Sequence, residues 1–479
     1  MFEIRKKKNH IWLVSLIVVG ILLSAQFVQI AQLQNEVSTL RSSQSHTGNP
    51  AMPYSYEIFS INDIIFAKNG TTGQIDYSGT DAATVINAAL ASLTTGGKVV
   101  LKHGLYIITS PIYIDNPSID FSMEDMWMGQ QINTMTQLCG LKLANGSNCP
   151  VLVIGQADLS GSNARKCHVH DLYIDANKAG QTTGNGIDMD TDGALDLHLN
   201  DVYVMNAKNS GIYWRGGAGI AERVYVEYCD SNGWVISNKD NRFIGCGSWW
   251  CDVGFRAIYQ QNEISDCIVY GSTKYGILSS GYDVQIIGNR IYQSGREGIQ
   301  VWNSRNIVVG NLVESPSMTS NNTYDGIQLT TAGTSAQYCI VKGNIIYSDQ
   351  TNKPRYCISE LSSADFNIIE GNVVLNAQTF PILKQGANTV VKSNVGYVTE
   401  NSGTATVASG EWILHGLAGT PTNVIVTTRT TIYGTPAVPV VVGWANQNST
   451  RFQVSVYWIN GTAITADVIN ISWVAEHNP

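Results

Sequence analysis

A short phrase, Gly-Asn followed by apolar residues, returns through the second half of the chain and constrains its fold more than any other feature. Its asparagines stand at positions 289, 311, 344, 372 and 394, so the steps are 22, 33, 28 and 22 residues. A second phrase, glycine followed by a large apolar residue, keeps a similar spacing at Gly186, Gly211, Gly233, Gly254, Gly276, Gly298 and Gly326. Steps of this size are typical of a solenoid in which each repeat forms one coil and the length variation lies in loops.

The coils are predicted to consist of β-strands. Each repeat offers short β-rich runs, such as 284–287, 290–293 and 299–302, and leaves no room for a helix. Three strands per coil and about ten coils predict an all-β parallel β-helix. Each asparagine should stack on the one a coil below, at a bend with left-handed backbone, and its amide should bond the amide of the next coil. Toward the N-terminus the same column is expected to continue through His170, Asn200, Glu222, Cys246 and Cys267.

Residues 81–114 carry a resemblance to a known family. They read Asp81-Ala-Ala-Thr-Val-Ile-Asn-Ala-Ala-Leu, then Gly96-Gly97-Lys-Val-Val-Leu, then Gly104-Leu-Tyr-Ile-Ile. This segment resembles the N-terminal entry of the pectate-lyase-like superfamily of right-handed β-helices, which includes polygalacturonase-like enzymes and phage tailspikes. The resemblance spans roughly residues 60–400 and implies the fold rather than a chemistry. Positions 82, 85, 86, 89 and 90 form one apolar stripe, so a helix here should cover the end of the solenoid core.

The N-terminal residues predict a membrane anchor. Residues 1–10 are basic and should stay in the cytoplasm, while the mostly apolar segment 11–31 is predicted to be a transmembrane signal anchor that places the rest on the extracellular face. A cleavable signal peptide, which would give a secreted protein, is the alternative. Residues 32–41 continue a heptad seam and predict a short coiled-coil stalk, hence a homotrimer as a hypothesis. Residues 42–59 are expected to form a linker that leads into the β-helix of residues 60–400.

The tail, residues 403–479, has a different pattern from the repeats and predicts a small antiparallel β-sandwich. Its strands are expected at 424–427, 438–444, 452–458 and 468–474. The segment resembles the short C-terminal β-modules of phage tail fibres and some secreted β-helix proteins, which implies either trimerisation or contact with carbohydrate. Its tryptophans could stack on sugars, but strand alternation places Trp458 and Trp473 with the apolar set, which favours a core role.

Composition limits the class of partner. A formal net charge of −8, with only 14% charged residues, argues against nucleic acid. It agrees with an extracellular protein that either handles polysaccharide or serves as a scaffold.

A solenoid of this type displays alternate strand residues as long parallel columns, and function is expected in these columns or in loops. If the residue after each Gly-apolar pair points outward, one column contains Asp188, Tyr213, Val235, Arg256, Leu278, Gln300 and Gln328. Two residues further along, a second column contains Asp190, Arg215, Ser237, Ile258, Ser280, Trp302 and Thr330. The candidate catalytic residues are therefore Asp188, Asp190, Arg215 and Arg256, and the candidate substrate-binding residues are Tyr213, Gln300 and Trp302.

The most specific local motif is the acidic segment 188–196, which resembles the first part of a calcium-binding loop. Asp188, Asp190, Asp192 and Asp196 occupy positions one, three, five and nine, and Gly193 occupies position six. Position twelve is Leu199 instead of the bidentate glutamate, so a solvated acidic loop is the alternative. Calcium beside Arg215 or Arg256 would suit a polysaccharide lyase.

Hydrolysis is the competing chemistry. It would use Asp188 with Asp190, or Asp190 with Asp192, on the two sides of a glycosidic bond. The Asn-Thr-Asp, Asp-Asp, Gly-His-Gly and Arg-Ile-Lys signatures of the superfamily's hydrolases are absent from the sequence, which weakens this alternative.

Histidines at 168, 170 and 198 stand at matching positions of two coils. They are either ligands of a transition metal or turn and packing residues.

Two functions remain open at this stage. The first is a cell-surface protein that binds, and in one version also cleaves, polysaccharide. The second is a non-catalytic structural surface protein, such as an adhesin or an envelope spike.

Overall fold

The computed structural model describes residues 52–124, 139–155, 163–189, 194–331, 335–429, 440–463 and 468–479. The predicted anchor, the stalk and the linker up to residue 51 lie outside these ranges. Within them, no helix combines the length and the apolar character needed to cross a bilayer.

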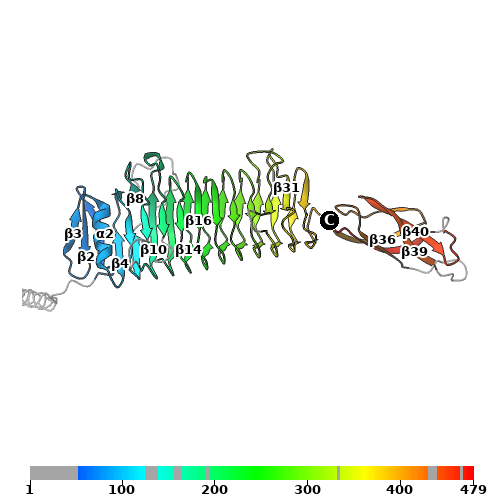
Figure 1. Ribbon diagram of the computed structural model, residues 1–479, viewed down its shortest axis with the longest axis horizontal. Helices are drawn as coiled ribbons and strands as arrows, with labels where there is room; N and C mark the ends of the chain where they lie inside the picture. The colour runs from blue at the N-terminus through cyan, green and yellow to red at the C-terminus, as the bar shows by residue number, and fades with distance from the viewer. Residues whose placement is uncertain are drawn as a thin grey trace, which may run out of the picture. The chain divides into compact units, whose positions relative to one another are not determined.

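The central part of the chain is a parallel β-helix with three strands per coil (Figure 1). One coil contains β20 (Glu263–Ser265), β21 (Ile268–Tyr270) and β22 (Ile277–Ser279). Each of these strands pairs in parallel with its counterpart in the next coil, namely β23 (Gln285–Ile287), β24 (Arg290–Tyr292) and β25 (Ile299–Val301). The predicted strand composition and coil arrangement are therefore confirmed.

The strands form two large sheets. An 11-stranded sheet contains β6 (Ile112–Ile114), β9 (Leu152–Ile154), β11 (Ile187–Met189), β13 (Ile212–Trp214), β16 (Asn232–Ile236), β19 (Val253–Ala257), β22, β25, β28 (Ile327–Leu329), β31 (Tyr356–Glu360) and β34 (Phe380–Leu383), stacked in chain order. The other two strands of each coil belong to a 24-stranded sheet. The strands of this sheet are β1 (Tyr56–Ile61), β2 (Ile64–Asn69), β3 (Ile75–Gly79), β4 (Gly97–Leu101), β5 (Leu105–Ile108), β7 (Ile119–Met123), β8 (Gly140–Leu143), β10 (His168–Asp175), β12 (His198–Met205), β14 (Ile220–Glu222), β15 (Tyr225–Glu227), β17 (Arg242–Ile244), β18 (Gly247–Trp249), β20, β21, β23, β24, β26 (Ile307–Val309), β27 (Leu312–Glu314), β29 (Ile340–Lys342), β30 (Ile345–Tyr347), β32 (Ile368–Glu370), β33 (Val373–Val374) and β35 (Val390–Lys392). A 3-10 turn, η1 (Lys178–Gly180), lies in a loop.

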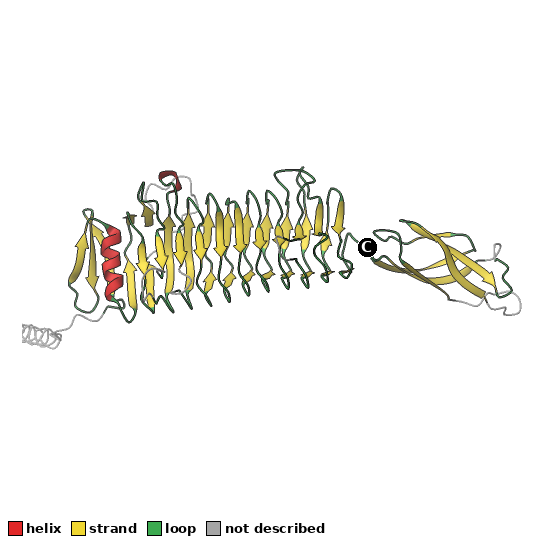
Figure 2. Cartoon of the chain, in the orientation of Figure 1, coloured by secondary structure: helices red, strands yellow, loops and turns green. Residues whose placement is uncertain are grey.

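A helix, α2 (Ala82–Ser92), lies at the N-terminal end of the β-helix, as the apolar stripe predicted (Figure 2). The Asp81 side chain accepts a hydrogen bond of 2.9 Å from Thr84 N and so caps the first turn. The buried residues of the helix are Ala82, Ala83, Val85, Ile86, Ala89 and Leu90. They shield the apolar interior of the first coils from water.

The core consists of inward side chains stacked coil upon coil. Trp234 and Phe255 are paired in register and their rings stack at 5.4 Å. Trp214, which alternation predicted to point inward, is fully buried. The indole nitrogen of Trp214 donates to the Asn241 side chain at 3.0 Å, so its polar edge is satisfied inside the core.

The repeated asparagines form a buried ladder. Asn289 Oδ1 accepts hydrogen bonds of 2.9 Å from Cys267 N, and Asn311 Oδ1 accepts from both the backbone and the side-chain nitrogens of Asn289. The same pattern continues through Asn344, Asn372 and Asn394. The predicted amide stacking is confirmed.

The predicted left-handed bend at these asparagines is confirmed. The left-handed conformation belongs to the residue before each asparagine, with φ of 67° at Gly288 and 68° at Gly310. Glycine adopts this region without a Cβ clash, and the asparagine that follows can then turn its amide inward.

The N-terminal continuation of the column is wrong by two residues. Glu222 is in register with Ile244, while Tyr225 is in register with Gly247, so it is Val224 that aligns with Cys246. The column therefore passes from Cys246 through Val224 to Val202 and Leu172. His170, Asn200 and Glu222 precede their left-handed residues, whereas the ladder asparagines follow theirs.

The tail forms two three-stranded antiparallel sheets. One contains β36 (Glu400–Val407), β41 (Ile469–Glu476) and β38 (Asn423–Thr428), and the other contains β37 (Trp412–Leu414), β40 (Arg451–Trp458) and β39 (Val440–Gln447). Side chains from both sheets share one core, in which Trp473 packs edge-on against the fully buried Phe452 at 5.5 Å. Trp473 thus has the core role that alternation favoured.

Candidate functional site

The outward column predicted from the sequence lies on the outer face of the 11-stranded sheet. Asp188 pairs with Tyr213, Tyr213 with Val235, and Val235 with Arg256. The column then passes through Leu278 and Gln300 to Gln328 and Ser359. Candidate residues distant in the sequence therefore share one face.

Asp188 is engaged by neighbours at one end of this face. Its Oδ1 forms an ion pair with Arg215 and its Oδ2 accepts a 3.0 Å hydrogen bond from Asn185. The Arg215 guanidinium also lies 4.8 Å above the Tyr213 ring centroid. Since both carboxylate oxygens of Asp188 have partners, the group is better suited to positioning Arg215 than to proton transfer.

The calcium motif is described only in part. Asp190 and Asp192 lie outside the described residues, and Asp196 is exposed. The structure therefore shows Asp188 and Asp196, but not the arrangement of the four carboxylates.

Arg256 and Trp302 lie further along the same face. Arg256 is half-buried, and its Nε is a buried atom without a hydrogen-bond partner. Trp302 Nε1 donates to Gln300 Oε1 at 2.8 Å, and Gln300 Nε2 donates to Gln328 Oε1 at 2.6 Å. Gln328 Nε2 in turn donates to Asp325 Oδ2 at 2.7 Å. A directed chain of hydrogen bonds thus joins the candidate residues to an acid that sequence reasoning missed.

Asp325 is the centre of this network. It is fully buried, and Arg355 contacts both of its oxygens, with Nη2–Oδ2 at 2.9 Å and Nε–Oδ1 at 3.1 Å. Ser359 Oγ donates to the same carboxylate at 2.6 Å. These donors hold the buried carboxyl of Asp325 in one fixed position.

Glu297 occupies the equivalent position one coil earlier. Asp325 and Glu297 each stand two residues before an isoleucine, and these isoleucines, Ile327 and Ile299, are paired in register. Glu297 is only 5% exposed. The pKa of Glu297 is raised to about 7, chiefly by burial and to a lesser extent by Asp325, against the opposing effects of a hydrogen bond from its own backbone and of Arg296 and Arg355.

Basic and aromatic side chains surround the acid. The Arg296 guanidinium lies 5.8 Å from the Tyr275 ring centroid and 5.6 Å from that of Tyr324. Arg355 lies over the Tyr356 ring at 4.9 Å. This arrangement combines a protonatable carboxyl with cations and ring faces, which are the groups that an acidic sugar requires.

A sequence signal for the acids existed. Glu297-Gly298-Ile299 and Asp325-Gly326-Ile327 place a carboxylate before the Gly-apolar phrase in two consecutive coils. The prediction followed the residues after that phrase and therefore reached Gln300 and Trp302 but not the acids beside them.

A family model described as "Right handed beta helix region" matches residues 185–333 and, in a second match, residues 228–410. No curated protein sequence matches the chain. The fold is a right-handed parallel β-helix of the pectate-lyase-like kind, as the sequence resemblance implied.

Solved structures agree with this fold. The A-module of the Azotobacter vinelandii mannuronan C-5 epimerase AlgE6 is 17% identical, with a TM-score of 0.54, over 66% of this chain and 95% of that one. The A-module of AlgE4 from the same organism is 16% identical, with a TM-score of 0.52, over 65% and 96%. The enzymatically active domain of tailspike protein 2 of bacteriophage CBA120 is 11% identical, with a TM-score of 0.50, over 83% and 71%. Identities this low show the fold alone.

Proposed function

We propose that the outer face of the 11-stranded sheet binds an acidic polysaccharide and that Glu297 transfers a proton in its cleavage. The observation that carries the proposal is a buried carboxyl with a pKa of about 7, next to the ion pair of Asp325 and Arg355. A group with this pKa is divided between its two protonation states near neutral pH, which suits proton transfer.

Each residue has a distinct role in this proposal. In hydrolysis, Glu297 gives a proton to the glycosidic oxygen while water attacks the anomeric carbon and releases its own proton to solvent. In elimination, ionised Glu297 takes the proton beside the uronate carboxylate while the neighbouring bond to the glycosidic oxygen breaks, a C=C bond forms and the leaving oxygen takes a proton from solvent. Asp325 accepts hydrogen bonds from Arg355, Gln328 and Ser359, so it acts as a positioning residue, while burial is the main cause of the raised pKa of Glu297. Trp302 lies at the start of the hydrogen-bonded chain and offers a ring to a sugar.

An acidic substrate is favoured by the arginines on this face. Arg215 and Arg256 each have a buried Nε without a hydrogen-bond partner, and Arg296 has ring faces as its neighbours. Guanidinium groups pair with carboxylates in two-point geometry, so a uronate would satisfy these donors. Asp188 lies five strand spacings before Gln300, or about 24 Å, a length that admits an oligosaccharide.

The names of the structural neighbours point in the same direction. Two are mannuronan epimerases and one is an enzymatically active tailspike domain. They support the handling of polysaccharide, while the assignment of residues rests on the geometry of this chain.

The test is a screen of acidic and neutral polysaccharides with two readouts, the absorbance of unsaturated uronate and the release of reducing ends. Elimination gives both products, whereas hydrolysis gives reducing ends alone. Glu297→Gln should abolish cleavage and retain binding, while Glu314→Gln on β27, in the other sheet, should retain both. Cleavage at the wild-type rate by Glu297→Gln would refute the role of this residue.

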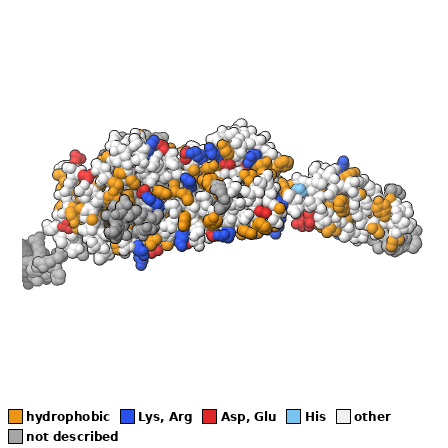
Figure 3. All heavy atoms as spheres, in the orientation of Figure 1, with side chains coloured by type: hydrophobic (Ala, Val, Ile, Leu, Met, Phe, Trp, Pro, Cys, Tyr) orange, Lys and Arg blue, Asp and Glu red, His pale blue; other side chains and the backbone are white. Residues whose placement is uncertain are grey.

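A non-catalytic surface protein is the second candidate, and an exposed apolar surface supports it. Ile345, Ile368 and Val390 are 39% to 47% exposed on strands of the 24-stranded sheet, and Figure 3 shows hydrophobic side chains on the surface of the β-helix. Such a surface suits contact between copies of the chain, which agrees with the trimer proposed from the heptad seam. In this version the apolar segment 11–31 anchors the assembly at the extracellular face of a membrane.

Calcium at the segment 188–196 also remains a proposal. Asp188 is engaged by Arg215, so an ion would depend on Asp190, Asp192 and Asp196. Calorimetric titration with millimolar calcium tests it, because heat that disappears in Asp192→Ala would support the site, and no heat in the wild type would remove it.

A further inference from the structure

Two histidines and an aspartate gather on the outer face of the 24-stranded sheet, away from the sheet that carries Glu297. Asp120 lies on β7, and His168 and His170 lie on β10, the strand that pairs with β7 in register. Asp120 is paired with His168, and His170 follows two residues later on the same face of the strand. The three side chains come from segments almost fifty residues apart.

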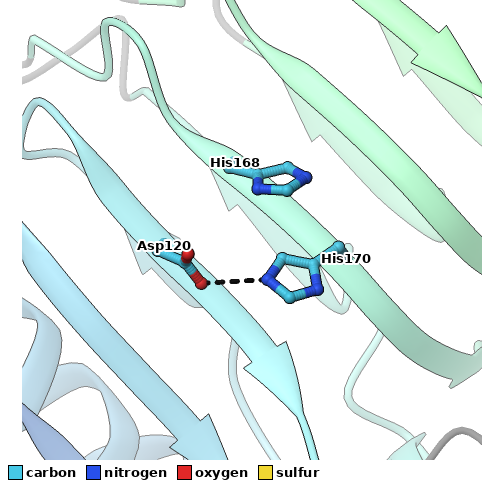
Figure 4. A group of neighbouring side chains, drawn as sticks. All are labelled: Asp120, His168 and His170. Carbon is cyan, nitrogen blue, oxygen red and sulfur yellow. Dashed lines mark hydrogen bonds and ion pairs between the residues drawn. The ribbon is translucent and has the colours of Figure 1, made fainter. Parts of the chain in front are cut away.

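The ligand atoms of these residues converge. One nitrogen from each ring and one carboxylate oxygen all lie within 4.8 Å of one another, and His170 Nε2 is 3.0 Å from Asp120 Oδ1 (Figure 4). The rings of His168 and His170 are stacked at 4.3 Å between centroids. This spacing lets one small cation contact all three groups after small side-chain movements.

Asp171 orients His170 from outside the cluster. Its Oδ2 lies 2.7 Å from His170 Nδ1, so this carboxylate can accept a hydrogen bond from a proton on Nδ1. The lone pair of the neutral ring is then on Nε2, the atom that faces Asp120. A carboxylate behind a histidine in this way fixes the tautomer of metal-ligating histidines.

His168 supplies an independent observation. Its Nε2 is a buried atom without a hydrogen-bond partner. A buried polar atom of this kind costs free energy unless something binds it. His198, paired with His168 on the next coil, also has a buried Nε2 without a hydrogen bond, although Glu222 Oε2 lies 3.5 Å away.

We propose that Asp120, His168 and His170 bind a divalent transition-metal ion of the Zn²⁺ class, with Asp171 as the positioning residue behind His170. Two imidazoles and one carboxylate suit Zn²⁺, Co²⁺ or Ni²⁺, while calcium prefers oxygen ligands throughout. The ion joins β7 to β10 and therefore fastens two consecutive coils near the N-terminal end of the β-helix. Solvent would complete the coordination, because Asp120 is partly exposed.

The test uses the whole protein without a histidine tag, freed of metal by a chelator. Titration with Zn²⁺ should show one site by calorimetry, and Co²⁺ should give a visible absorption band of nitrogen and oxygen coordination. His168→Gln and His170→Gln should each weaken Zn²⁺ binding by more than about 100-fold, and Asp171→Asn by about 10- to 100-fold. His103→Gln, at an exposed histidine of the same sheet region, should leave the affinity unchanged.

Folding of each variant is checked by its melting temperature in chelator, which should match that of the wild type. Zn²⁺ should then raise the melting temperature of the wild type and of His103→Gln equally, that of Asp171→Asn less, and those of the two histidine variants least. Absence of a Zn²⁺ site in the wild type would overturn the proposal and leave His170 as a hydrogen-bonded partner of two carboxylates. Equal affinity of the wild type and Asp171→Asn would overturn the positioning role.

Discussion

Arg355 and Asp325 form a two-point ion pair on the outer face of the 11-stranded sheet, with N–O distances of 2.9 and 3.1 Å. The carboxylate is fully buried and the Arg355 side chain is 34% exposed. A similar two-point pair, Arg305 with Asp283, lies at the surface with 55% and 39% of its side chains exposed. The two pairs share a geometry and differ in burial.

Replacing the arginine should therefore have different costs at the two places. Arg355→Met leaves Asp325 charged and buried, and should lower the free energy of unfolding by about 3–5 kcal/mol. Arg305→Met leaves Asp283 in contact with water and should change the free energy of unfolding far less. Urea unfolding at neutral pH measures both, and equal costs would contradict the central role of Asp325.

Glu297 predicts a dependence of stability on pH. Its pKa is about 7 in the folded protein against an ordinary value of 4.5, so the folded state prefers the protonated form. The stability that this preference contributes is complete below pH 4.5 and is lost as the pH rises through about 7. Glu297→Gln should match the wild type at pH 4 and exceed it by about 3 kcal/mol above pH 8. Denaturant unfolding at the two pH values measures the difference, and a constant difference would show that the carboxyl is not perturbed.

Replacing an asparagine of the ladder should lower the free energy of unfolding, whereas replacing an exposed residue beside it should not. Asn289→Ala removes the acceptor of Cys267 N and the donor to Ile264 O, both inside the protein. Unsatisfied buried groups cost about 1–3 kcal/mol each, so the total should be of the order of 3 kcal/mol. Gln285→Ala, at an exposed position of the same coil, is the control and should change little. Thermal and urea unfolding measure both variants, and similar midpoints would refute the ladder's contribution.

Binding of an acidic polysaccharide should depend on Arg256. A charge-assisted hydrogen bond contributes about 1.5–3 kcal/mol, so Arg256→Met should weaken binding about 10- to 100-fold. Arg242, which pairs with Glu263 on the other sheet, provides the control Arg242→Met. Calorimetry at two salt concentrations measures the affinities, and an equal loss in both variants would place the binding surface elsewhere.

Self-association should depend on the exposed apolar residues of the C-terminal coils. Ile345 is 44% exposed on β30, and Ile345→Asp places a charge in the proposed contact. The variant should therefore become monomeric at protein concentrations at which the wild type is still associated. Ile75→Asp, at an equally exposed isoleucine of β3, should not change the mass. Light scattering during size-exclusion chromatography measures the mass. A wild-type protein that is monomeric at all concentrations would contradict the trimer.

Much of the fold could be predicted because the repeat is local and periodic. Gly-apolar spacing set the register of the column from Asp188 to Gln328, since one residue of slippage would turn the apolar set outward. The same periodicity gave the wrong residue for the column at the bend near Asp171. His170 was predicted to belong to the column, but Leu172 does, and the two differ in standing before or after a left-handed residue. The local sequence near Asp171 does not contain the glycine that marks this bend at Gly288.

Which acid forms the candidate site depends on burial in the tertiary structure. Glu297 and Asp188 are both acids beside the same repeated phrase, yet Glu297 is only 5% exposed, while Asp188 forms an ion pair with Arg215 and accepts a hydrogen bond from Asn185. The sequence by itself determined that the coils stack and which residues share a column, because alternation and turn chemistry act over a few neighbours. Only the tertiary structure decided which carboxyl is buried, paired or left protonatable, because these properties depend on charges and side chains contributed by other coils.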